Sequence, residues 1–381
     1  MTGNWVRPML ARERTEEHRT ATALELFFDL CFVVAVALAA SGLHHALTEA
    51  HVGAGVLGYL MVVFAIWWAW NNFTAFASAY DNDDGLYRLT TLVQIVGALV
   101  LAAGVPAALE KRDLLVVTAG YVIMRLAMVA QWLRAARSDP PRRATALRFA
   151  AGITAVQVGW VLRLALPGAW GVAGFVVLAL AEMAVPVWAE RVEPTTWHPE
   201  HLAERYSLFT LIVLGEVVLA STSAIQHSLA DGEHLGTLLG LAAAGVVIVF
   251  AMWWLYFDRP APRALDSLSA ALPWAYGHYP VFAAVAAVGA GLEVAVDFDT
   301  GQTTLTPMAA GWATAVPVAV YVLVVWLLRI RGGVMPAWLN ASYPVVALLV
   351  LASPFSHAPI HVTAVLLAAL VTARSLGQRR G

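Results

Sequence analysis

The chain reads VVFAIWWAW at residues 62–70, and 186 residues later a closely similar run, IVFAMWWLY, occupies residues 248–256. Each run follows a carboxylate in an otherwise apolar stretch: Asp29 lies 38 residues before Trp67, and Glu216 lies 37 residues before Trp253. A twofold internal repeat in an apolar chain is a common plan of membrane transporters and channels. The pattern therefore predicts two related halves.

Composition places the chain among integral membrane proteins. Hydrophobic residues make up 60% of the 381 residues and charged residues only 13%, the mean hydropathy is +0.71, and there are 15 tryptophans. One soluble core could not bury so much apolar surface. The 23 basic and 25 acidic residues nearly balance, so no nucleic-acid partner is expected. The single cysteine, Cys31, excludes an intrachain disulfide and a cysteine-based zinc cluster.

Twelve apolar windows are long enough to cross a bilayer, whose core of about 30 Å needs about 20 helical residues. The windows are 24–43, 54–74, 89–108, 113–133, 146–166, 170–189, 206–225, 236–256, 271–291, 308–328, 334–352 and 357–374. They are continuously apolar, unlike the alternating strands of a membrane barrel. The sequence therefore predicts an all-α integral membrane protein with about twelve transmembrane helices.

The basic residues predict the orientation, because cytoplasmic loops hold the excess of lysine and arginine. With twelve spans, 19 of the 23 basic residues fall on the side that both termini share, Lys111, Arg112 and Arg163 fall on the other side, and Arg125 lies inside the fourth span. Both termini are therefore expected in the cytosol. Six spans per half is an even number, which predicts two parallel six-helix repeats rather than inverted ones.

The same reading gives the domain layout. The expected parts are a cytosolic N-terminal tail at 1–23, a first six-helix half at 24–190, a cytosolic linker at 191–203, a second six-helix half at 204–375 and a C-terminal tail at 376–381.

A few charged side chains fall inside the predicted spans. They are Glu25, Asp29, Arg125, Glu182 and Glu216. A charge deep in a span costs roughly 2.5–3.5 kcal/mol on insertion scales, so each should face the bundle interior and have a partner. We interpret these five residues as candidates for a transport pathway or binding site. The alternative is a structural ion pair between Arg125 and one of the acids.

The repeated aromatic pairs are Trp67 with Trp68 and Trp253 with Trp254. Core packing is the expected role of these rings. Because neighbouring side chains point about 100° apart on a helix, the alternative is that one ring of each pair faces the bundle and the other the lipid. A histidine at the outer end of a span, such as His44, is interpreted as an interfacial anchor. No metal site and no cofactor are expected.

Two polar groups are predicted to meet at a cytosolic vestibule, one in the loop before the third helix and one at the start of the seventh. The residues of this vestibule are Asp81, Asp83, Asp84, Arg88, His201, Glu204 and Arg205. The acidic loop lacks the sixth-position glycine and the closing glutamate of an EF-hand. Its expected role is instead an N-cap for the third helix, with Arg88 paired to an aspartate.

Six stretches carry a family resemblance. They are LELFFDL at 24–30, WWAWNNF at 67–73, YDNDD at 80–84, HLAER at 201–205, VLGE at 213–216 and HYP at 278–280. In order and along nearly the whole chain, they resemble the bacterial low temperature requirement protein A (LtrA) family. The resemblance implies a multi-spanning protein of the bacterial inner membrane and assigns no activity to any residue.

The repeat and the intramembrane charges favour a channel or secondary transporter for a cation, a proton or a small solute. Two alternatives stay open: a membrane-embedded lipid-handling enzyme, and a sensor or scaffold that transports nothing. The expected partners are membrane lipid and an unidentified small solute or ion. A homodimer is compatible with small-residue patches such as Ala35, Ala39 and Gly42.

Overall fold

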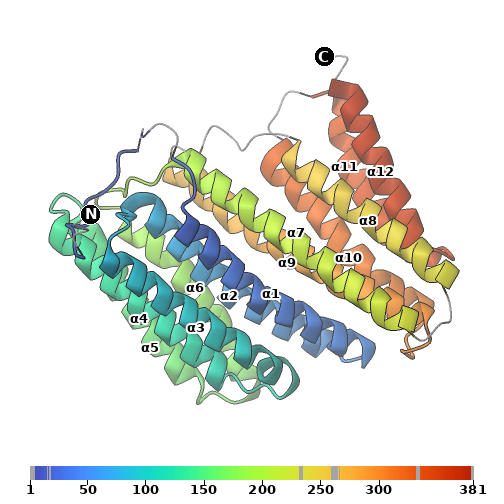
Figure 1. Ribbon diagram of the computed structural model, residues 1–381, viewed down its shortest axis with the longest axis horizontal. Coiled ribbons are helices and arrows are strands. Elements are labelled where there is room, and N and C mark those ends of the chain that lie inside the picture. Colours follow the sequence, from blue (N-terminus) through green and yellow to red (C-terminus); the bar gives the residue numbers. More distant parts are fainter. Residues whose placement is uncertain are drawn as a thin grey trace. The chain divides into compact units, whose positions relative to one another are not determined.

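The computed structural model describes residues 5–14, 16, 19–230, 235–258, 265, 267–331 and 335–378. Within these residues the chain forms helices and no strands, and twelve helices are long and apolar enough to cross a membrane (Figure 1). This confirms the predicted fold class, an all-α membrane protein with twelve spans.

The helix bounds follow the predicted windows closely. The first six helices are α1 (Ala23–Thr48), α2 (Val52–Tyr80), α3 (Gly85–Glu110), α4 (Leu115–Ser138), α5 (Arg143–Arg163) and α6 (Gly168–Ala189). The second six are α7 (Pro199–Ala230), α8 (Leu235–Phe257), α9 (Leu268–Asp299), α10 (Pro307–Val325), α11 (Ala337–Ala352) and α12 (Pro359–Gln378). A π-helical turn, Trp326–Ile330, extends α10. The largest difference is in α9, which runs eight residues past the predicted end at 291.

The chain packs as two compact units. The first comprises Met1–Leu38 and Met61–Arg205, and the second comprises Ala39–Leu60 and Tyr206–Gly381. The C-terminal end of α1 and the start of α2 therefore belong to the second unit. That these units are parallel repeats remains a prediction.

Side-chain caps fix where several helices begin. Thr22 and Glu25 form a capping box at α1: the Thr22 amide donates to Glu25 Oε2 at 2.7 Å, and the Glu25 amide donates to Thr22 Oγ1 at 3.3 Å. At α10, Thr306 accepts from the Ala309 amide at 3.2 Å and Pro307 occupies the first turn.

Glycines allow close packing of one helix pair in each unit. A Cβ atom on Gly120 of α4 would collide with the backbone of Leu101 in α3. A Cβ atom on Gly291 of α9 would collide with the backbone of Ala313 in α10. Small residues let membrane helices approach until their backbones touch, which is a principal source of packing energy in a bilayer.

The two Trp-Trp pairs have different environments. Trp67 and Trp68 are both buried in the first unit, whereas Trp253 and Trp254 are 42% and 45% exposed in the second. Both rings of the first pair are thus packed in the core and both rings of the second pair are partly exposed, so neither pair has one inward and one outward ring. Trp68 donates to Glu182 of α6, and Trp67 packs against Phe64 and Trp68 of its own helix.

Candidate functional site

A buried ion-pair cluster lies at the N-terminal end of α1, in the first unit. Arg205 of α7 contacts both acids of α1: its Nη1 lies 2.9 Å from Glu25 Oε1, and its Nη2 and Nε donate to Asp29 at 2.6 and 3.1 Å. All three side chains have no exposed surface. Trp70 Nε1 also donates to Asp29, at 2.6 Å. Asp29 is thus a fully hydrogen-bonded carboxylate in a two-pronged pair with a guanidinium.

The cluster extends toward the predicted vestibule. His201 Nε2 lies 3.2 Å from Glu25 Oε1, and Arg19 Nη2 lies 3.8 Å from both Glu25 and Asp81. Asp81 is buried at the end of α2. Burial, followed by the charge of Glu25, raises the pKa of Asp81 to about 6. Of the predicted vestibule, Asp81, His201 and Arg205 therefore converge on Glu25.

The other vestibule residues have separate roles. Asp84 caps α3 by accepting from the Tyr87 amide at 2.8 Å, as predicted, and it also pairs with Arg134. Asp83 pairs with Arg88 at 2.7 Å on the surface, and Arg88 lowers the pKa of Asp83 by hydrogen bonding. Glu204 accepts from the Ala21 amide at 3.2 Å.

A second buried ion pair lies deep in the first unit. Arg125 of α4 donates to Glu182 of α6 at 3.0 Å. Glu182 also accepts from Trp68 at 2.8 Å, Tyr121 at 3.0 Å and Trp160 at 3.2 Å. Four donors from α2, α4 and α5 therefore surround one carboxylate. This geometry is that of the structural ion pair named as the alternative for Arg125.

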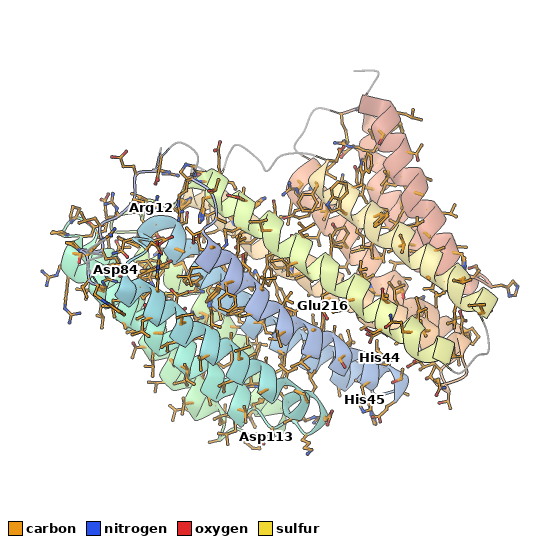
Figure 2. The ribbon with its side chains drawn as sticks, in the orientation of Figure 1. Arg12, His44, His45, Asp84, Asp113 and Glu216 are labelled. Carbon is orange, nitrogen blue, oxygen red and sulfur yellow. The ribbon has the colours of Figure 1, made fainter. Side chains whose placement is uncertain are left out.

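The second unit holds an acidic group of a different kind, which we name the His44 cluster: His44, Glu216, Glu293 and Asp297. His44 Nε2 lies 2.7 Å from Asp297 Oδ2, and His44 Nδ1 lies 3.5 Å from Glu293 Oε2. Glu216 is partly exposed in α7, and it lies close enough to Glu293 for the two charges to repel each other. Figure 2 labels His44 near the end of α1 and Glu216 midway along α7.

Glycine brings the helices of this cluster together. Val217 of α7 lies 3.6 Å from where a Cβ atom on Gly289 of α9 would stand, and Glu293 follows Gly289 by one helical turn. Among the described residues, no arginine or lysine lies within 4 Å of any acid of the cluster, and no group of histidines and acids has the arrangement of a metal site.

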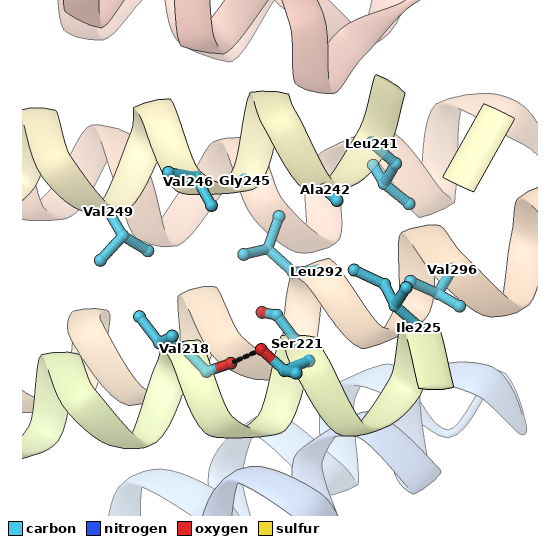
Figure 3. A pocket seen from close by; sticks show the side chains of 11 residues that line it. Val218, Ser221, Ile225, Leu241, Ala242, Gly245, Val246, Val249, Leu292 and Val296 are labelled. Carbon is cyan, nitrogen blue, oxygen red and sulfur yellow. Dashed lines mark hydrogen bonds between the residues drawn. The ribbon is translucent and has the colours of Figure 1, made fainter. Parts of the chain in front are cut away.

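An apolar groove runs beside the cluster, between α7, α8 and α9 (Figure 3). The groove is open to one side, and its walls include Val218, Leu241, Val249 and Leu292. The hydroxyls of Ser221 and Thr222 line it as well, but each already donates to a backbone carbonyl of its own helix. The groove therefore offers mainly apolar contacts.

Comparison with known proteins decides the family. The model of the bacterial low temperature requirement A protein (LtrA) matches residues 20–375, nearly the whole chain. The chain belongs to the LtrA family. It is also 28% identical over 351 residues to an uncharacterized protein of Rhizobium meliloti (strain 1021), with 86% of this chain and 81% of that protein covered.

The structure of this LtrA protein adds residues that the sequence reasoning missed. Trp70, Arg19 and Tyr87 belong to the buried cluster of the first unit, and Glu293 and Asp297 belong to the His44 cluster. Glu293 and Asp297 lie four residues apart, a spacing that places two side chains on one helix face. That spacing was a usable signal, but both acids fell outside the window predicted for the ninth span.

Proposed function

We propose that this LtrA protein moves protons or other small cations across the membrane, and that the His44 cluster is its ion-binding site. One observation carries the proposal: the acids of this cluster have no arginine or lysine partner in the described part of the chain, whereas Glu25, Asp29 and Glu182 of the first unit each pair with an arginine. An intramembrane acid without a fixed counter-charge is by default a functional group.

The first unit is less suited to the same task. Asp29 and Glu182 each bind a guanidinium and at least one tryptophan N–H, so a passing cation would have to compete with several donors already in place. Truncating one partner of such a buried pair destabilises a protein by roughly 3–5 kcal/mol, which describes a scaffold rather than an exchange site. The proposed pathway therefore excludes Asp29, Arg125 and Glu182, although the sequence had nominated them.

The number of protons that the His44 cluster must hold favours a proton as the transported or coupling ion. A neutral imidazole has one N–H donor and one bare nitrogen. Both ring nitrogens of His44 face carboxylate oxygens, so a neutral ring between two ionised acids would set a lone pair against a lone pair. The arrangement is favourable when it holds one more proton, either on the imidazole or on a carboxylate.

The cluster also extends along the direction that an ion must travel. At 1.5 Å per residue, Glu216 lies about 26 Å from the start of α7, whereas His44 lies about 6 Å from the end of α1. Glu293 links the two: its charge interacts with that of Glu216, and its Oε2 lies 3.5 Å from His44 Nδ1. Such a series of titratable groups can pass a proton by short steps.

Flux measurements test the proposal. Purified protein in liposomes carrying a pH-sensitive dye is expected to dissipate an imposed pH gradient, or to move one of a panel of monovalent and divalent cations. Glu216→Gln and Glu293→Gln should each lower that flux at least tenfold. Glu49→Gln is the matched control, because Glu49 is half-exposed beyond the end of α1 and pairs only with His45 and His51.

Two results would overturn the proposal. One is wild-type flux that Glu216→Gln and Glu293→Gln leave unchanged, which would place the pathway elsewhere. The other is absence of flux for every ion of the panel from protein that is folded by size-exclusion chromatography, which would favour a sensor or scaffold.

We also propose that the protein lies in the bacterial inner membrane with both termini in the cytosol. The excess of basic residues on the side of the termini supports this orientation. Fusing a reporter that is active only in the periplasm to the C-terminus should give no signal, whereas a cytosolic fluorescent reporter should give one. The opposite pair of results would reverse the orientation.

A further inference from the structure

The segment before α1 is docked on the first unit, and we name its described part, residues 5–14, 16 and 19–22, the N-terminal strap. The Leu86 amide donates to the Trp5 carbonyl at 3.1 Å, and the Arg12 amide donates to the Ala79 carbonyl at 2.8 Å. Met9 is fully buried. The strap therefore covers the end of α2 and the start of α3, where Figure 2 labels Arg12 and Asp84.

Basic side chains of the strap bind the carboxyl end of α2. Arg12 Nη1 donates to the Asp81 carbonyl at 3.0 Å, and Arg19 Nη2 donates to the Ala77 carbonyl at 3.2 Å. The last carbonyls of a helix have no partner within the helix, and the helix dipole there favours cations. These contacts give the strap a physical reason to remain closed.

Charge does not balance beneath the strap. Arg205 is taken up by Glu25 and Asp29, and Arg12 is paired with Glu16, so among the described residues the guanidinium within 4 Å of the Asp81 carboxylate is that of Arg19, at 3.8 Å and shared with Glu25. Counting Arg12 with Glu16, three guanidinium groups thus stand against four carboxylates. An excess charge in such surroundings is unfavourable unless a proton or another cation neutralises it.

A neighbouring hydroxyl is also unsatisfied. Tyr87 of α3 is fully buried, its hydroxyl has no hydrogen-bond partner among the described residues, and the charges that act on it most are those of Asp81 and Glu25. Buried hydroxyls nearly always have a partner. An unpartnered phenol beside an excess of negative charge marks a place where one more hydrogen-bonding group is bound.

We propose that a proton bound at Asp81 neutralises this cluster and holds the N-terminal strap closed over it. The groups that face Asp81 are Arg12 and Arg19 from the strap, Glu25 from α1, and Tyr87 and Arg88 from α3, with His201 and Arg205 of α7 acting through Glu25. The site is separate from the His44 cluster and does not depend on transport.

The sign of the effect follows from linkage. The pKa of Asp81 is about 6 under the closed strap, because burial and Glu25 oppose its ionisation, against an ordinary value of 3.8. The closed form therefore binds the proton more tightly than an open form does. Closure is strongest at low pH and weakens as the pH rises through 6. Between pH 7.5 and pH 5 the ratio of closed to open strap should rise about tenfold.

One histidine of the α7 start also contacts the strap. His198 Nδ1 accepts from the His201 amide at 3.3 Å. His198 Nε2 lies 3.0 Å from the Glu16 carbonyl of the strap, so His198 is a second residue to test beside Asp81.

Hydrogen exchange of the full-length protein in detergent micelles tests the proposal. After correction for intrinsic exchange, the amide of Arg12 should be about tenfold better protected at pH 5 than at pH 7.5. Asp81→Asn should keep the strap protected at both pH values, with no pH response. Asp83→Asn is the matched control on the same loop, because Asp83 pairs with Arg88 on the surface, and it should respond as the wild type does.

A second variant keeps the test decisive if Asp81→Asn fails to fold. Arg19 is the guanidinium that favours the ionised form of Asp81, so Arg19→Gln should move the midpoint of the pH response upward. An unchanged midpoint, a wild-type strap with no pH response, or an Asp81→Asn variant that still responds would each overturn the proposal. A pH response that disappears in His198→Asn and persists in Asp81→Asn would also overturn it.

Discussion

Arg205 and Asp29 form a two-pronged ion pair, at 2.6 and 3.1 Å, with no surface of either side chain exposed. The two residues are 176 positions apart and lie on α7 and α1. Because Arg205 also lies 2.9 Å from Glu25, one guanidinium forms ion pairs with two acids of the same helix face. The pair fixes the start of α7 against the start of α1 within the first unit.

Removing this guanidinium should severely destabilise the protein. Arg205→Leu would leave Asp29 buried without a counter-charge and Glu25 with Arg19 alone at 3.8 Å, so we expect a loss of roughly 3–5 kcal/mol. Thermal unfolding in detergent, followed by size-exclusion chromatography, measures it. The matched control is Arg88→Leu, which breaks the exposed pair with Asp83 and should change the midpoint little. An Arg205→Leu protein as stable as the wild type would contradict the scaffold role.

Glu182→Gln should also destabilise the fold. The new amide keeps one oxygen as an acceptor, but its NH₂ group is a donor and faces N–H and O–H groups that are also donors. The substitution also leaves Arg125 buried without a counter-charge. We expect a loss of roughly 3 kcal/mol, together with a change in tryptophan fluorescence, because Trp68 and Trp160 donate to different oxygens and one of them loses its acceptor. Glu110→Gln, at the exposed end of α3, should stay within about 0.5 kcal/mol of the wild type.

Gly120→Ala should separate α3 from α4. The new methyl group would meet the backbone of Leu101, which cannot move aside as a side chain can, so a loss of roughly 1–3 kcal/mol is expected. Gly53→Ala is the matched control, because nothing lies within 4 Å of a Cβ atom there. Equal unfolding temperatures for the two variants would show that α3 and α4 pack less closely than the structure indicates.

Asp84 should contribute stability that depends on pH. Burial acts to raise the pKa of Asp84, but hydrogen bonds from Arg134 and from the amides of Arg7 and Tyr87 outweigh it and lower the pKa below 3.8. A lowered pKa means that the contribution is complete above about pH 4 and is lost as the pH falls further. Asp84→Ala should therefore cost about 1–2 kcal/mol at pH 7 and less at pH 3. A difference that grows on acidification would contradict the assignment.

Hydropathy and local spacing sufficed for the parts of the structure that depend on near neighbours in the chain. Length and apolar content predicted every span, and the position of Asp84 before an apolar run predicted its N-cap. Partners far apart in sequence were out of reach. Arg205 was predicted in the vestibule but not opposite Asp29, because no local pattern relates residues 176 positions apart.

The His44 cluster shows a second limit of the sequence. The predicted ninth span ended at 291, so Glu293 and Asp297 were counted as loop residues, although α9 continues to Asp299. A helix can carry acids beyond its apolar core when another side chain pairs with them, and here His44 does so from α1. His44 was interpreted as an interfacial anchor for the same reason: its partners were missing from the predicted helix.

The neighbouring histidines His44 and His45 offer the sharpest test of that cluster. His44 lies between Glu293 and Asp297, whereas His45 is exposed and pairs with Glu49 one turn along α1. His44→Asn removes the bridging imidazole and should lower proton flux in liposomes at least tenfold. Because the cluster is partly exposed, the unfolding temperature should change little.

His45→Asn alters the same chemistry one position away and should leave flux unchanged. If both variants lose flux equally, the effect belongs to the end of α1 as a whole and not to the imidazole between the two acids. If His44→Asn keeps flux while Glu216→Gln abolishes it, protons reach Glu216 without passing His44. His44→Lys separates charge from proton transfer, because it puts a fixed positive charge beside Asp297. If flux falls in His44→Asn, stays normal in His45→Asn and recovers in His44→Lys, His44 supplies charge and does not carry the proton itself.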